Sequence, residues 1–107
     1  MKDLADLMKQ AGAMQSKLQA AQEAIAALEV EGQAGGGMVR IVMNGKGYVK
    51  AVAIERALLK PDDGEVVEDL IAAALNDAKS KLDARAAEEM KSLTAGMTLP
   101  PGMKLPF

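Results

Sequence analysis

The chain has 107 residues, 50% of them apolar, and carries a formal net charge of −2. It contains no cysteine and no histidine, which excludes disulfides and thiol chemistry and removes the most common metal ligand and the usual general base near neutral pH. Tyr48 and Phe107 are the only aromatic residues, so aliphatic, methionine and alanine side chains must build the core. The length predicts one domain, and because no basic and apolar leader opens the sequence, we expect a cytoplasmic protein.

Charge is distributed unevenly along the chain. Residues 1–31 have a net charge of −2, residues 32–60 of +4 and residues 61–92 of −5. The middle third is therefore a basic region between acidic neighbours. Such a region can attract an anion locally, although the acidic balance of the whole chain does not favour polyanions.

An apolar stripe with steps of three and four residues predicts a helix from about residue 3 to residue 28. The stripe consists of Leu4, Leu7, Ala11, Met14, Leu18, Ala21, Ile25 and Leu28. Such a helix is roughly 39 Å long, whereas a compact globule of this chain length is about 34 Å across. Part of the stripe is therefore expected to meet another helix, from this chain or from a second copy.

The middle of the chain predicts two strands joined by a hairpin. Four glycines in residues 32–37 cannot sustain a helix, and a strand or bulge region is expected to begin there. Residues 38–43 and 48–54 are rich in β-branched side chains. The sequence Asn-Gly-Lys-Gly at residues 44–47 favours a tight turn, since asparagine and glycine tolerate the positive φ that such turns need.

The pairing of these strands suggests a dimer. With a two-residue loop at residues 45–46, Ile41 pairs with Lys50 and Val39 with Val52. Both faces of the sheet are then largely apolar, and the helices cover only one of them, so we expect the other face to contact a second copy. The predicted dimer interface comprises Val39, Arg40, Ile41, Val42, Val49 and Val52.

A second long helix is predicted after Pro61. Asp62 is expected to be its N-cap and Glu65 to complete a capping box. Gly96 is expected to end the helix, and residues 97–107, with three prolines and no periodicity, are expected to form an extended tail. The chain is thus predicted to be a single domain over residues 1–96 followed by a tail. The apolar face of this helix consists of Val67, Ile71, Leu75, Ala78, Leu82, Ala86, Met90 and Leu93.

Other motifs offer little chemistry. In a phosphate-binding loop, a hydroxyl residue and a helix follow the glycines. Neither Gly-Gly-Gly at residues 35–37 nor Gly-Lys-Gly at residues 45–47 is followed by them, so turns are favoured. The acidic residues between positions 62 and 69 are typical of a first helical turn, where the helix dipole favours them, rather than of a metal site. No histidine is present to activate a serine. We expect no cofactor, no metal and no enzymatic activity.

Basic residues on the two helices have two interpretations. In the first, they complement a helix dipole or form exposed ion pairs, Asp77 with Lys81 and Arg85 with Glu89. In the second, a dimer duplicates them into a surface that contacts the phosphates of double-stranded DNA, while the scarcity of aromatic residues argues against stacking on single strands. The candidates for DNA contact are Lys9, Lys17, Lys79, Lys81 and Arg85.

The order of these features resembles the YbaB/EbfC family of nucleoid-associated proteins. The most specific marks are the glycine-rich residues 31–37 and the hairpin sequence at residues 44–47, at their mutual spacing. Asn-Asp-Ala at residues 76–78 and the Pro, Gly and Met-rich residues 99–107 agree as well. The resemblance covers essentially the whole chain.

The resemblance implies an α+β protomer with a long N-terminal helix, a three-stranded antiparallel sheet and a long C-terminal helix, joined through the sheets into a tweezer-like homodimer. It also implies a bacterial cytoplasmic protein of the nucleoid that binds double-stranded DNA, alters its conformation and influences gene expression. We expect no membrane contact and no small-molecule substrate. The alternative is a structural or adaptor dimer whose long helices bind a partner protein, which the acidic second helix favours.

Overall fold

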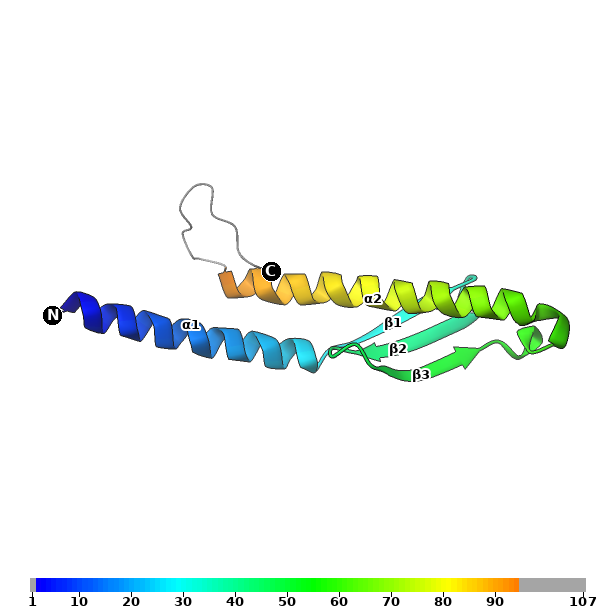
Figure 1. Ribbon diagram of the computed structural model, residues 1–107, viewed down its shortest axis with the longest axis horizontal. Coiled ribbons are helices and arrows are strands. Elements are labelled where there is room, and N and C mark those ends of the chain that lie inside the picture. Colours follow the sequence, from blue (N-terminus) through cyan, green and yellow to red (C-terminus); the bar gives the residue numbers. More distant parts are fainter. Residues whose placement is uncertain (1, 95–107) are drawn as a thin grey trace, which may run out of the picture.

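The computed structural model of the protein describes residues 2–94, which form two long helices and one sheet (Figure 1). The elements are α1 (Lys2–Ala26), β1 (Glu29–Ala34), β2 (Val39–Asn44), β3 (Val49–Ile54), the short 3-10 turns η1 (Arg56–Leu58) and η2 (Pro61–Asp63), and α2 (Gly64–Thr94). The predicted α+β class, with a helix before and after a three-stranded antiparallel sheet, is confirmed. Neither long helix of this described part contains an apolar stretch that would cross a membrane.

The molecule is an elongated rod. Its principal extents are 74 × 27 × 16 Å and its radius of gyration is 20.3 Å, whereas a compact domain of this length has about 13 Å. The helix α2 lies along one face of the sheet and continues beside the C-terminal part of α1, in the opposite direction (Figure 1). The N-terminal part of α1 extends past the end of α2, away from the sheet.

The core lies between α2 and the strands β1 and β2. Two clusters of buried residues fill it: Val30, Met43, Ala78 and Leu82 form one, and Val39, Ile41, Leu58 and Ala74 form the other. The alanines of α2 permit a close approach to β1. A side chain at Gly32 would collide with the backbone of α2 at Ala74 and Ala78, so this glycine is required by the packing of the helix on the strand.

The strands have the order β1-β2-β3, and the predicted register of the hairpin is wrong. Ile41 pairs with Val52, not with Lys50, and Val39 pairs with Ile54, with an irregularity between Val42 and Met43. The pairing is shifted by two residues for two reasons: the turn is one residue longer than expected and includes Gly47 as well as Gly45 and Lys46, and the irregularity between Val42 and Met43 adds the second residue.

Asn44 closes this turn with its side chain. Its Oδ1 accepts the backbone N–H groups of Lys46 at 2.9 Å and Tyr48 at 3.0 Å, and Gly47 adopts a φ of 87°. The turn is also fitted to α1, because a side chain at Gly45 would collide with the carbonyl of Ile25. The hairpin sequence thus specifies a turn over residues 45–47 that docks on the end of α1.

Both helix boundaries differ slightly from the predictions. The helix α1 ends at Ala26, so Leu28 lies in the connection to β1. Asp62 lies inside η2 and α2 begins at Gly64, so Asp62 does not have the predicted N-cap position; Pro61 instead starts a separate 3-10 turn.

The predicted apolar face of α2 is confirmed at Val67, Ile71, Ala78 and Leu82, which lie in or against the core, but not at Leu75. Ala74 is fully buried whereas Leu75 is exposed, because the small side chain is the one that fits against β1. The predicted helix end at Gly96 and the tail at residues 97–107 lie outside the described residues, as does the side chain of Leu93.

Candidate nucleic-acid interface

One of the predicted DNA-contact residues, Lys81, joins Asp77 in holding α2 to the free edge of β1. The Lys81 Nζ lies 3.0 Å from the Asp77 carboxylate and donates a hydrogen bond of 3.0 Å to the carbonyl of Glu31. The same Asp77 carboxylate accepts the N–H of Gln33 at 2.9 Å. We call Asp77 and Lys81 the edge pair, since they satisfy backbone groups on the outer side of β1.

The edge pair has a clear electrostatic signature. The hydrogen bond from the Gln33 N–H, and secondly that from Lys81, hold the pKa of Asp77 below its ordinary value. The predicted ion pair between Asp77 and Lys81 is confirmed. Because the Lys81 ammonium already has a carboxylate and a carbonyl as partners, it is less available to a phosphate than a free lysine.

Lys79 and Arg85 also lie among carboxylates. The Lys79 Nζ forms an i,i+4 ion pair of 2.5 Å with Asp83 on the exposed side of α2. Arg85 lines a hollow of about 360 Å³ between the start of β1 and α2, together with Lys81 and the three glutamates Glu29, Glu31 and Glu88. The structure therefore brings Lys81 and Arg85 together, but within a hollow that has more negative than positive groups. Arg85 does not form its predicted ion pair with Glu89 in the described structure.

Lys9 and Lys17 lie on α1, far from this hollow. Both are exposed, and neither side chain has a hydrogen bond or an ion pair within residues 2–94. They are eight residues apart, which corresponds to about 12 Å along a helix. Of the five predicted DNA-contact residues, these two lie on the part of the molecule that extends from the sheet, and among residues 2–94 they have no carboxylate partner.

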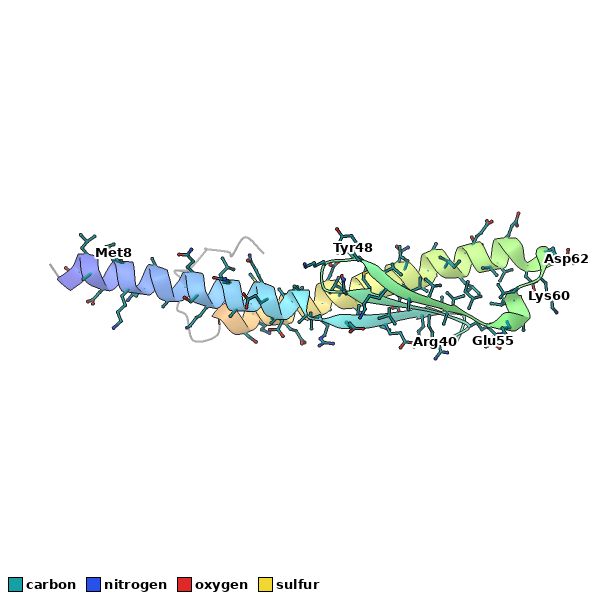
Figure 2. The ribbon with its side chains drawn as sticks, turned by 90° about the horizontal axis from the view of Figure 1, so that it is seen from below. Met8, Arg40, Tyr48, Glu55, Lys60 and Asp62 are labelled. Carbon is teal, nitrogen blue, oxygen red and sulfur yellow. The ribbon has the colours of Figure 1, made fainter. Side chains whose placement is uncertain are left out.

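Three further cations lie outside the predicted set. Lys46 lies at the tip of the hairpin, and Arg56 and Lys60 lie between β3 and α2; all three are exposed and form no side-chain ion pair in the described part of the chain. Arg56 lines a second hollow of about 280 Å³ that also includes Arg40 and Glu55. Arg40, Glu55 and Lys60 lie toward the same end of the sheet (Figure 2). The +4 charge of residues 32–60 is the sequence signal that identifies this group.

The predicted dimer interface divides into two groups. Val39 and Ile41 have no exposed surface because α2 covers them, so they belong to the core of the protomer and present nothing to a second copy. This corrects their assignment as interface residues. Arg40 is exposed, and its Nε lies 4.0 Å from Oε1 of Glu31. Val42 is half-buried. Val49 and Val52, on β3, are 42% and 50% exposed.

The two edges of the sheet differ in cover. The helix α2 contacts β1 and β2, and the edge pair closes the outer side of β1. The strand β3 lies beyond α2 (Figure 1) and has five exposed side chains in succession. Its outer edge is therefore the one on which another strand can pair.

Comparisons with known proteins agree with this geometry. The chain matches the model of the YbaB/EbfC DNA-binding family over residues 1–97. It is 52% identical to a nucleoid-associated protein of Agrobacterium fabrum and 50% identical to one of Brucella ovis, in both cases over the full length of both chains. The structure is similar to the crystal structure of an uncharacterized protein from Helicobacter pylori, with a TM-score of 0.64 and 26% identity over 87% of this chain and 94% of that chain.

Proposed function

Because the chain belongs to the YbaB/EbfC DNA-binding family, we propose that it acts as a homodimeric nucleoid-associated protein of the bacterial cytoplasm. In this proposal it binds double-stranded DNA mainly through phosphate contacts, alters the conformation of the DNA and thereby influences nucleoid organisation and gene expression. It is a binding protein and not an enzyme.

The phosphate-contact mode rests on one observation: some of the candidate cations have a carboxylate partner among the described residues and others do not. Lys79 and Lys81 have carboxylate partners, and a phosphate must displace these before it gains contact with either lysine. Lys9 and Lys17 form no ion pair within residues 2–94, so we expect them to contribute most of the helix-borne affinity, with Arg85 weaker because of the glutamates around it. Arg56 and Lys60 add a second basic group at the sheet end.

The uncovered strand β3 supports the homodimer. Val49 and Val52 expose apolar surface there, next to an open sheet edge, whereas the edge pair closes the opposite edge. We expect two copies to meet through β3 and the outer face that carries Arg40 and Val42. Two sets of projecting helices would then present Lys9 and Lys17 twice, at a separation fixed by the sheets.

DNA affinity measured against salt tests the proposal. Binding of the wild-type protein to random and to defined duplexes is expected to weaken log-linearly with salt, by about 0.9 log units per log unit of salt for each phosphate contacted. The affinities for the two kinds of duplex should be similar, since phosphate contacts carry no sequence information. Affinity that does not change with salt would exclude the phosphate-contact mode.

A partner protein is the alternative that the acidic hollow between β1 and α2 favours. Its three glutamates, and the −5 charge of residues 61–92, suit a basic protein segment better than DNA. A complex that survives nuclease treatment, together with DNA affinity no better than the ~10⁻⁴ to 10⁻⁶ M range of non-specific binding at physiological salt, would favour this adaptor function.

A further inference from the structure

The apolar stripe of α1 is covered along only part of its length. Near the C-terminal end of the helix, Ala21 is buried and Leu18 is half-buried where α2 lies alongside. Toward the N-terminus every side chain from residue 3 to residue 13 is exposed, and Leu4, Leu7 and Met8 are 60%, 62% and 69% exposed. Figure 2 shows Met8 on this projecting part of α1. The same stripe thus continues beyond the point where its cover ends.

The cover ends because α2 ends. The described part of α2 ends beside the C-terminal half of α1, and α2 runs toward the N-terminus of α1 (Figure 1). The described end of α2 therefore lies close to the point where the uncovered part of the stripe begins. We call Leu4, Leu7, Met8 and Ala11 the open stripe.

The composition of the following residues suits this surface. Residues 95–107 carry a single charge, Lys104, and five large apolar side chains, which are Met97, Leu99, Met103, Leu105 and Phe107. The open stripe is flanked in sequence by Asp3 and Asp6, whose charge is opposite to that of Lys104. An apolar segment with one positive charge is therefore matched to an apolar stripe with acidic neighbours.

The segment is also long enough. From Met14, where the stripe becomes half-buried, to Leu4 is about 15 Å along a helix, whereas thirteen extended residues reach about 40 Å. We propose that residues 97–107 dock on the open stripe of α1 in the same chain. A second copy is the less suitable occupant, because the uncovered strand β3 lies at the sheet end of the rod, away from the open stripe (Figure 1).

Docking on this face leaves the proposed DNA contact free. Lys9 follows Leu7 by two residues and so points about 200° around the helix from it. Docking of residues 97–107 on the open stripe does not require DNA binding, and DNA binding does not require the docking.

Disulfide trapping tests the docking, since the chain has no cysteine of its own. One full-length double variant combines Ala11→Cys, on the open stripe, with Thr98→Cys in the tail. The matched control combines Ala13→Cys with Thr98→Cys; both alanines are exposed and two residues apart, so the tether is equally long and only the face of α1 differs. We expect the first pair to oxidise within one chain at least about tenfold faster than the control.

A third variant connects the trapping rate to the apolar contact. Adding Leu4→Gln and Leu7→Gln to the first pair is expected to slow its oxidation to the rate of the control, while the helix content stays that of the wild type because both leucines are exposed. Equal rates for the Ala11→Cys and Ala13→Cys pairs would overturn the proposal. So would an Ala11→Cys pair that forms mainly covalent dimers, because a second copy would then be the occupant.

Discussion

The two edge strands of the sheet, β1 and β3, differ in how their outer sides are covered. At β1 the edge pair, Asp77 and Lys81, binds two outer backbone groups, the N–H of Gln33 and the carbonyl of Glu31, and α2 lies directly on the strand. At β3 the side chains are exposed and α2 provides no cover. The closed edge therefore belongs to the fold of the protomer, while the open edge is the place where the proposed dimer would form.

The largest expected effect is at the closed edge. Gly32→Ala introduces a methyl group that collides with the backbone of α2 at Ala74 and Ala78, so the helix must lift from β1. We expect the free energy of unfolding to fall by about 3 kcal/mol, measured by urea denaturation. Gly12→Ala is the control: nothing lies near that position in α1, so the same substitution should stabilise the protein by up to ~1 kcal/mol. Equal effects at the two positions would contradict the close approach of α2 to β1.

The next effect is expected at the open edge. Val52→Glu places a charge on exposed β3, where the protomer itself tolerates it but an apolar dimer interface does not. We expect the dimer dissociation constant to rise at least about 100-fold, or about 2.8 kcal/mol, in sedimentation measurements over a range of concentrations.

Val66→Glu is the matched control for the dimer, since Val66 lies on α2 and is 48% exposed, close to the 50% of Val52. It should leave the dissociation constant unchanged. A wild-type protein that stays monomeric at micromolar concentration, or equal weakening by the two variants, would contradict an interface at β3.

A smaller, pH-dependent effect is expected from the edge pair. The folded-state pKa of Asp77 is lowered, so its contribution to stability is present above the ordinary carboxylate pKa of about 4 and disappears as the pH falls through the lower folded-state value. Asp77→Asn should therefore be less stable than the wild type at pH 7, and the difference in urea midpoint should shrink below about pH 4. A difference that stays constant down to about pH 2 would contradict the role of the carboxylate charge.

Sequence periodicity predicted both helices and the existence of the hairpin, because these depend on local spacing. The register was not predictable, since it depends on Asn44 closing the turn with two backbone amides. The glycines of residues 32–37 predicted the beginning of a strand or bulge region, but the third strand of the sheet followed only from the family resemblance, and β1 begins earlier, at Glu29. Gly32 is required by a helix that packs on it at Ala74, far away in the sequence.

The candidate site divides in the same way. The ion pair between Asp77 and Lys81 follows from i,i+4 spacing and is confirmed, whereas their hydrogen bonds to β1 join residues 44 and 50 positions apart and leave no local signal. Burial of Val39 and Ile41 likewise depends on which face of the sheet α2 covers. Arg56 and Lys60, which we propose as a second basic group, belong to the segment whose charge of +4 sets it apart in the sequence.

Phosphate binding by the cations of α1 can be measured from the salt dependence of DNA binding by the double variant Lys9→Ala/Lys17→Ala. The control variant is Lys79→Ala/Asp83→Ala, which removes an ion pair and so leaves the net charge unchanged. The wild-type protein and the two variants are titrated on the same duplex over a range of salt concentrations. We predict that the slope of log affinity against log salt becomes less steep by about 0.9 for each phosphate that the Lys9→Ala/Lys17→Ala variant no longer binds. For the two lysines of one protomer the expected change is about 1.8. The control variant should keep the wild-type slope. An unchanged slope in the Lys9→Ala/Lys17→Ala variant would contradict phosphate binding by the free cations of α1.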